Sequence, residues 1–216
     1  MSITIIIIIV TALVSFAAFN NQQLMDKLIF YPPAVTDNKQ YYRFISCGFI
    51  HADIPHLLFN MLSFYLFSEQ LVEPKFNEFF GEAGKLMFLT MYLLALVVCL
   101  LPTYFKNKHN EHYRSLGASG AVSAVVFAGL LISPLTMVGF FFIPPIIPGF
   151  IFGPLYLLLS WYLDKRQAGN INHSAHIWGA LFGVAFLLIA TRIYSTEDIW
   201  ANFVESVKFY FKSKFG

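Results

Sequence analysis

The sequence predicts an all-α membrane protein: a bundle of six transmembrane helices with a long membrane-associated first loop and a C-terminal amphipathic helix. Of 216 residues, 57% are hydrophobic and only 12% are charged, whereas about 25% are charged in ordinary soluble domains. The charges cluster, so several apolar runs approach the roughly 18 residues that indicate a transmembrane helix. We expect residues 1–194 to form one six-span domain and residues 195–216 to form a helical tail.

The first apolar run is expected to be a retained transmembrane helix. Ser15-Phe16-Ala17 loosely matches a signal-peptide cleavage site. However, no Lys or Arg precedes the run, and a signal peptide normally begins with a basic segment. A cleaved signal peptide is the alternative.

The segments between the runs differ in character. Asn21–Pro55 is polar but contains short apolar pieces, which favours a structured loop resting on the membrane. The acidic stretch Glu73–Glu82 is expected to turn the chain. Four prolines within Met137–Pro154 exclude a continuous helix there, so the fifth span should begin raggedly. The expected spans are Ser2–Asn20, His56–Val72, Lys85–Pro102, Leu116–Ile132, Ile147–Leu163 and Ser174–Ile193.

The C-terminal segment has the pattern of a surface helix. Ser195-Thr196-Glu197-Asp198 is typical of a capping box at a helix start. Apolar residues then fall on one face of the following helix. A helix of this kind lies in the membrane interface.

Charge and cysteine content exclude several classes of protein. A formal net charge of +2 is too small to indicate a nucleic-acid partner. Two cysteines form neither a disulfide framework nor a thiolate metal cluster. Basic residues divide eight to six between the two expected sides, so the positive-inside rule does not orient the chain.

Four polar residues inside the expected spans are candidates for function, because such groups are costly in a bilayer. They are His56 and Asn60 on span two, Ser119 on span four and His176 on span six. Even-numbered spans run in the same direction, so all four residues lie at one depth near one face. His56 and Asn60 are also spaced i, i+4 and share a face of their helix.

Ser119 and His176 have the residue types of a nucleophile and its base. A serine hydroxyl is a poor nucleophile until a base accepts its proton. Gly179 and Gly183 on span six form a face of small residues that lets membrane helices pack closely. We therefore expect span six to approach span four until the Ser119 hydroxyl reaches the His176 ring.

These segments resemble the rhomboid family of intramembrane serine proteases. Three pieces carry the resemblance: Gly117-Ala118-Ser119-Gly120, Ala175-His176-Ile177-Trp178-Gly179 with Gly183, and His56-Leu57-Leu58-Phe59-Asn60-Met61. Span number, span order and the long first loop also fit. The family's usual Trp-Arg pair in the first loop is represented here by Tyr42-Arg43.

The resemblance implies a Ser119–His176 dyad without a third carboxylate. It also implies an oxyanion hole that includes Asn60, His56 and the Ser119 backbone N–H, with Gly117 in the same substrate-binding group. The start of a helix concentrates free N–H groups and positive dipole, which suits an oxyanion near Ser119.

The predicted function is therefore that of an intramembrane serine endopeptidase that cleaves transmembrane segments through an acyl-enzyme. Its expected partners are transmembrane protein substrates and the lipid bilayer. We expect no cofactor, no metal and no nucleic acid, and predict no particular oligomeric state. We expect a multi-pass protein of the plasma membrane with its active site near the extracytoplasmic face.

Two alternatives belong to other functional classes. A non-catalytic rhomboid-like protein would use the same fold to bind membrane proteins. A metal-dependent hydrolase could use His51, His56 and His176, but paired ligands such as HExxH are absent from the sequence.

Less specific roles are also open for individual residues. Ser119 could be a helix-packing serine, and His56 could be a buried hydrogen-bond partner that holds the first loop. His51 is expected to be structural and His173 to be solvated. Glu73 is expected to stabilise helix ends rather than to catalyse.

Overall fold

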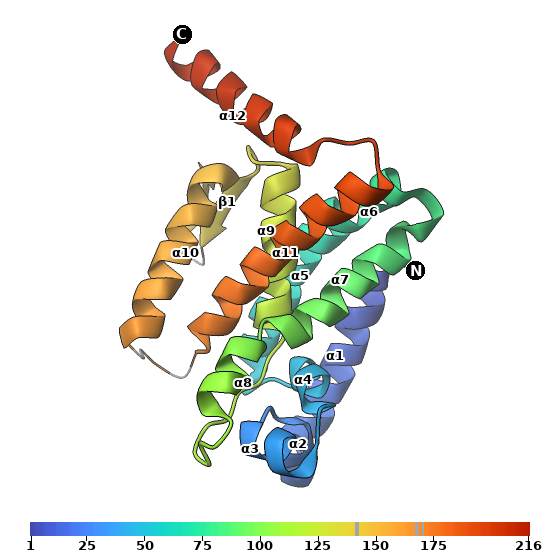
Figure 1. Ribbon diagram of the computed structural model, residues 1–216, viewed down its shortest axis with the longest axis vertical. Helices are drawn as coiled ribbons and strands as arrows, with labels where there is room; N and C mark the ends of the chain where they lie inside the picture. The colour runs from blue at the N-terminus through green and yellow to red at the C-terminus, as the bar shows by residue number, and fades with distance from the viewer. Residues whose placement is uncertain (141–142, 167–168, 170) are drawn as a thin grey trace.

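Helices from both halves of the chain surround α9 in the computed structural model, which describes residues 1–140, 143–166, 169 and 171–216 (Figure 1). Small side chains line α9, and most of its residues are buried. Its neighbours include α5, α7, α10 and α11. The longer helices are α1 Ile3–Phe19, α5 Ile54–Phe67, α7 Gly84–Val98, α9 Ser119–Ile132, α10 Gly149–Arg166, α11 His173–Tyr194 and α12 Ile199–Phe215.

The helical membrane architecture is confirmed, but the count of six spans is not. By length and composition, two helical stretches of the described chain could cross a bilayer, Ile54–Asn107 and His173–Tyr194. Helices α1 and α9 are apolar but shorter. The 14 residues of α9 extend only about 21 Å, less than the roughly 30 Å of bilayer hydrocarbon.

The first loop is structured, as expected. Arg43 is 7% exposed, and its Nη1 donates to the carbonyl oxygens of Asp26 at 2.8 Å and Ile29 at 2.6 Å. Tyr42 lies at the surface and donates to the Lys27 carbonyl at 3.2 Å. Arg43 therefore links the later part of the loop to its earlier part around Asp26 and Ile29. The loop contains α2 Gln22–Leu28, α3 Pro32–Asn38, α4 Arg43–Ser46 and η1 Cys47–Phe49.

A buried carboxylate holds the start of α1. Glu73 accepts hydrogen bonds from the backbone N–H groups of Ile3 at 2.8 Å and Thr4 at 2.9 Å. These N–H groups have no partner within their own helix, and a negative charge favours the positive end of the helix dipole. The predicted stabilising role of Glu73 is confirmed.

The expected turn after span two is itself mostly helical. The π-helical segment η2, Ser68–Val72, continues α5 into α6, Glu73–Phe80. The chain reverses at Gly81, whose φ of 56° lies in the left-handed region. A short 3₁₀ turn, η3 Gly81–Ala83, leads into α7, and α8, Leu101–Asn107, follows it.

A short pair of strands precedes the fifth span in the otherwise helical chain. Strand β1, Met137–Phe140, pairs antiparallel with β2, Ile143–Pro148. A two-stranded hairpin tolerates proline because each strand has an unpaired edge. The following helix, α10, begins at Gly149 and contains Pro154 in its interior, so the expected irregular start is a hairpin followed by a helix.

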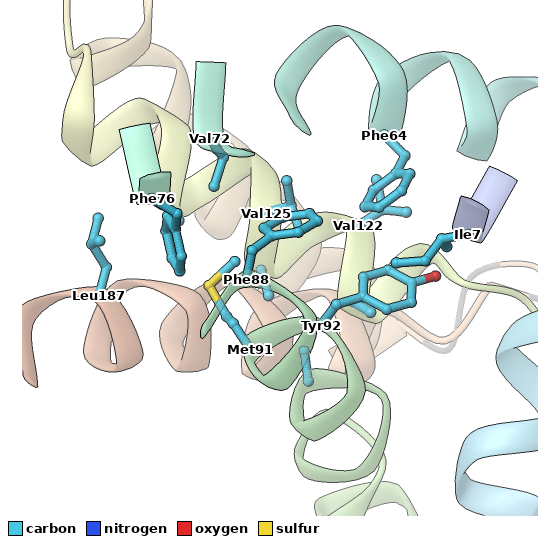
Figure 2. Close-up of a cluster of buried hydrophobic side chains, with 14 of the residues drawn as sticks. Ile7, Phe64, Val72, Phe76, Phe88, Met91, Tyr92, Val122, Val125 and Leu187 are labelled. Carbon is cyan, nitrogen blue, oxygen red and sulfur yellow. The ribbon is translucent and has the colours of Figure 1, made fainter. Parts of the chain in front are cut away.

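The hydrophobic core lies where α1, α5, α6, α7, α9 and α11 meet. Figure 2 shows Phe64, Phe76, Phe88 and Tyr92 gathered around Val125 of α9. The Phe64 and Tyr92 ring centroids are 5.0 Å apart, and those of Phe76 and Phe88 are 6.0 Å apart. This packing holds α5 and α7 against α9 and so supports the helices that carry the site.

The predicted C-terminal helix is present as α12. Its cap is Asp198, which accepts from the Ala201 N–H at 2.9 Å, rather than Ser195. In Figure 1, α12 extends away from the end of α9. Its location on the membrane surface and the division into residues 1–194 and 195–216 stay predictions.

Candidate active site

Ser119 and His176 are joined by a hydrogen bond, with 2.8 Å between Ser119 Oγ and His176 Nε2. Ser119 is the first residue of α9, and His176 lies in the first turn of α11. Both side chains are partly exposed. This is the geometry of a serine nucleophile beside an imidazole base.

Backbone contact between α9 and α11 brings these two side chains together. A methyl group added at Gly179 would lie 2.0 Å from the Gly120 carbonyl oxygen, and one at Gly183 would lie 2.1 Å from that of Ala124. No real Cβ tolerates such distances. The close approach predicted from the two glycines of span six is confirmed.

Gly117 shapes the loop before Ser119. Its φ is 107°, a conformation that side chains other than hydrogen rarely allow. An added Cβ would also lie 2.8 Å from Cε1 of His56. The Gly117 N–H donates to the Cys47 carbonyl at 2.9 Å, so this N–H is not free to bind an oxyanion. Gly117 therefore leaves room for the His56 ring to lie against the loop before Ser119.

The start of α5 brings His56 to this loop. Asp53 caps the helix by accepting from the His56 N–H at 2.7 Å. Asn60 is buried one turn further on. One hydrogen of its Nδ2 amide is donated to the His56 carbonyl at 2.9 Å, and this bond does not use the second amide hydrogen. No hydrogen bond among the described residues links Asn60 to the dyad.

His51 has the structural role that was expected. Its ring is fully buried. Its Nδ1 lies 3.0 Å from Ser15 Oγ, which donates to the Phe49 carbonyl, and its Nε2 accepts from the Ala118 N–H at 3.4 Å. Because Ser15 donates elsewhere, Nδ1 carries the proton of a neutral ring. Burial lowers the pKa of His51 to about 3, so the ring stays neutral and connects α1 to the start of α9.

Two residues near His176 were not anticipated. Tyr156 of α10 has its hydroxyl 3.1 Å from His176 Nδ1. His173 is 8% exposed, with its ring centroid 5.9 Å from that of His176. The prediction that His173 is solvated is wrong, because its side chain is buried at the start of α11 in ring contact with His176. Tyrosine near a membrane interface is common, so the sequence carries no signal for Tyr156.

The described residues offer no metal-binding group of three or more His, Cys, Asp or Glu side chains. The His51 and His56 rings are in edge contact, with centroids 4.9 Å apart. Both ring nitrogens of His51 are engaged in hydrogen bonds. Cys47 and Cys99 are buried free thiols, and burial raises the pKa of Cys47 to about 12. Cys47 therefore stays protonated and is no thiolate ligand.

The fold and the site define a membrane protein of the rhomboid type, and comparison with known proteins agrees. The Rhomboid domain model matches residues 38–193. The chain belongs to the rhomboid family.

Three relatives illustrate the similarity. The chain is 29% identical over 167 residues to the zebrafish (Danio rerio) "Presenilin-associated rhomboid-like protein A, mitochondrial", covering 76% of this chain and 40% of that protein. It is 29% identical over 161 residues to the human "Presenilin-associated rhomboid-like protein, mitochondrial", covering 71% and 38%. It is 31% identical over 145 residues to "RHOMBOID-like protein 12, mitochondrial" of Arabidopsis thaliana, covering 63% and 42%.

These matches bear on location and on length. All three relatives are named as mitochondrial proteins. The prediction of a plasma-membrane location is therefore wrong, because nothing in the spans distinguishes one membrane from another and the relatives point elsewhere. The chain spans about two fifths of the length of these relatives.

Proposed function

We propose that this chain is an intramembrane serine endopeptidase with Ser119 as nucleophile and His176 as base. The observation that supports this most directly is the 2.8 Å distance between Ser119 Oγ and His176 Nε2. A packing serine has no need of an imidazole at that distance, whereas nucleophilic attack requires one. The proposal includes six membrane spans, with the site near the starts of α5, α9 and α11.

The reaction has two steps. Ser119 Oγ attacks the scissile carbonyl carbon as His176 Nε2 takes the hydroxyl proton, and the oxyanion faces donors at the start of α9. The intermediate collapses, the C–N bond breaks, and His176 gives the proton to the leaving amine, leaving an acyl-enzyme. Water then attacks the ester carbonyl carbon as His176 takes its proton. The C–Oγ bond breaks, His176 returns the proton to Ser119 Oγ, and the product leaves with a free carboxyl group.

Three donors are proposed for the oxyanion hole: the Ser119 N–H, the Asn60 amide and the His56 ring. The Ser119 N–H belongs to the first turn of α9, where backbone donors lack partners within the helix. Asn60 retains one amide hydrogen beyond its bond to the His56 carbonyl. Losing one such donor typically costs about 3–4 kcal/mol of transition-state stabilisation.

The proposed substrates are transmembrane segments that unwind easily. An intact helix protects its carbonyl groups in internal hydrogen bonds, so helix-breaking residues near the cut should favour cleavage. Entry beside α10 is proposed, since only Gly149, Gly153 and Ser160 of this helix are buried.

A reporter-cleavage experiment tests this function. Purified protein in liposomes is incubated with a tagged single-span reporter that carries Gly and Pro near one end of its span. We expect one cleavage product from wild type, none from Ser119→Ala, and wild-type cleavage from Ser133→Ala, a serine at the far end of α9. Equal products from wild type and Ser119→Ala would contradict the proposal.

A second candidate is a non-catalytic protein that binds membrane-protein partners. The comparisons taken alone favour it, because two relatives' names describe association with presenilin and none names a cleavage. Under this function, wild type and Ser119→Ala would both capture the reporter intact. The names also favour a mitochondrial membrane, which organelle fractionation of a tagged chain would test.

A further inference from the structure

His176 has a second partner, and it comes from a third helix. The Tyr156 hydroxyl of α10 lies 3.1 Å from His176 Nδ1. The two rings are nearly parallel, at 23°, with centroids 6.3 Å apart. Tyr156 also stacks on Phe152 of its own helix, with ring centroids 5.9 Å apart. The phenol is thus held in place by ring contacts as well as by its hydroxyl.

The chemistry of the dyad depends on which nitrogen of His176 carries the proton. Nε2 can accept the Ser119 proton only when it is bare, and the neutral ring then carries its hydrogen on Nδ1. That Nδ1–H needs an acceptor. With the opposite tautomer, Nε2–H would point at Ser119 Oγ and no base would be present.

The surroundings of Tyr156 favour its oxygen as this acceptor. Ser123 of α9 and Ser160 of α10 are both buried, and both lie near the same phenol hydroxyl. The Tyr156 O–H can therefore donate to a serine while its oxygen accepts from Nδ1–H. No Asp or Glu among the described residues hydrogen-bonds His176, so no carboxylate performs this task.

We propose that Tyr156 is the positioning residue of the dyad: its hydroxyl holds His176 in the Nδ1–H tautomer and fixes the ring toward Ser119. The inference rests on the proposed function of this site. A neutral phenol here takes the orienting part that a carboxylate takes in a serine triad. Because Tyr156 is part of α10, a displacement of α10 removes the acceptor of the His176 Nδ1–H. The His176 ring is then oriented to take the Ser119 proton only while α10 packs against it.

Tyr156→Phe tests the proposal because it keeps the stacked ring and removes only the hydroxyl. The matched control is Tyr162→Phe on the same helix, whose ring lies at the surface beside Arg166. We expect Tyr156→Phe to lower kcat of reporter cleavage by about tenfold, the upper range for one neutral hydrogen bond, with KM unchanged. The control should match wild type in both.

A spectroscopic readout separates positioning from a merely structural role. Protein labelled with ¹⁵N-histidine, with the His176 signals assigned from His176→Ala, reports which ring nitrogen is protonated. We expect Nδ1–H in wild type and a mixture of tautomers in Tyr156→Phe. An Nε2–H ring in wild type would overturn the proposal without any variant. An unchanged tautomer and unchanged kcat in Tyr156→Phe would overturn it as well.

The two proposals fail in different ways. If wild type cleaves no reporter but the tautomer shifts as expected, the proposed function is wrong and the positioning contact stands. If wild type cleaves and Tyr156→Phe behaves as wild type in both readouts, only the role of Tyr156 is wrong.

Discussion

The contacts that α11 makes with α9 differ in kind from those that it makes with α10. Against α9, Gly179 and Gly183 leave no room for a methyl group, since it would lie 2.0–2.1 Å from carbonyl oxygens. Against α10, contact depends on side chains such as Tyr156 and His176. Helix α10 buries little and exposes Leu155, Leu158 and Leu159 to more than half of their area. Figure 1 shows α10 at the edge of the bundle.

The two kinds of contact have different consequences: one fixes the distance between Ser119 and His176, and the other leaves α10 easier to displace. The Ser119–His176 distance depends on backbone packing, which tolerates no change in volume. The position of α10 depends on fewer buried contacts, and such elements open most easily. For the proposed endopeptidase, this arrangement would let a substrate enter beside α10 without moving Ser119 and His176 apart.

The largest effect is expected from breaking the α9–α11 contact. In Gly179→Ala the new methyl group meets the Gly120 carbonyl, so α11 must move away from α9 and carry His176 with it. We expect cleavage to fall at least a hundredfold, in line with misplacement of a catalytic group by about 1 Å. The unfolding free energy should fall by about 1–3 kcal/mol. Reporter cleavage and thermal unfolding in detergent check both, and near-normal activity would show that the contact does not set the dyad.

A pH-dependent effect of intermediate size is expected from His51, which secures the start of α9. Burial lowers its pKa from 6.5 to about 3, so the unfolded chain gains a proton below pH 6.5 and the folded protein does not. The contribution of the neutral His51 ring to the free energy of unfolding is therefore complete above pH 6.5 and is lost as the pH falls toward 3. At about 1.4 kcal/mol per pH unit, roughly 2 kcal/mol is lost by pH 5.

His51→Gln isolates this contribution. The variant keeps a hydrogen-bonding side chain but has no titrating ring, so its unfolding midpoint should vary less between pH 7.5 and pH 5 than that of wild type. Parallel pH profiles for the two proteins would assign the acid sensitivity to other groups.

The smallest effect is expected on the α10 side. In Gly153→Ala the added methyl group would lie 3.4 Å from the Phe127 ring, an ordinary contact. We expect a change in unfolding free energy within about 0.5 kcal/mol and cleavage close to wild type, measured beside Gly179→Ala. A loss as large as that of Gly179→Ala would show that α10 packs on α9 as tightly as α11 does.

The sequence predicted the parts of the site that depend on helix direction and small residues. Ser119, His176 and the glycines of α11 lie on two helices with the same direction, and their spacing was enough to predict that they meet. The same reasoning placed Asn60 and His56 among the candidates, and the His56 ring lies close to Gly117 in the loop before Ser119. Their roles stay predictions.

What the sequence did not predict depends on contacts between distant segments. Tyr156 lies in an apolar run whose rotation about its axis no spacing rule defines. The hairpin Met137–Pro148 was missed because its prolines were taken only as helix breakers, whereas they also suit the free edges of a two-stranded sheet. The plasma-membrane prediction had no physical basis in the spans, and the mitochondrial relatives contradict it.

Labelling with a fluorophosphonate probe tests the central claim, an activated serine at the start of α9, most directly. The phosphorus reacts only with a serine whose proton a base can accept. We predict one adduct on wild type, mapped by peptide mass spectrometry to Ser119, and none on Ser119→Ala or His176→Ala. Absence of an adduct on folded wild type, or equal labelling of Ser119→Ala, would contradict the account.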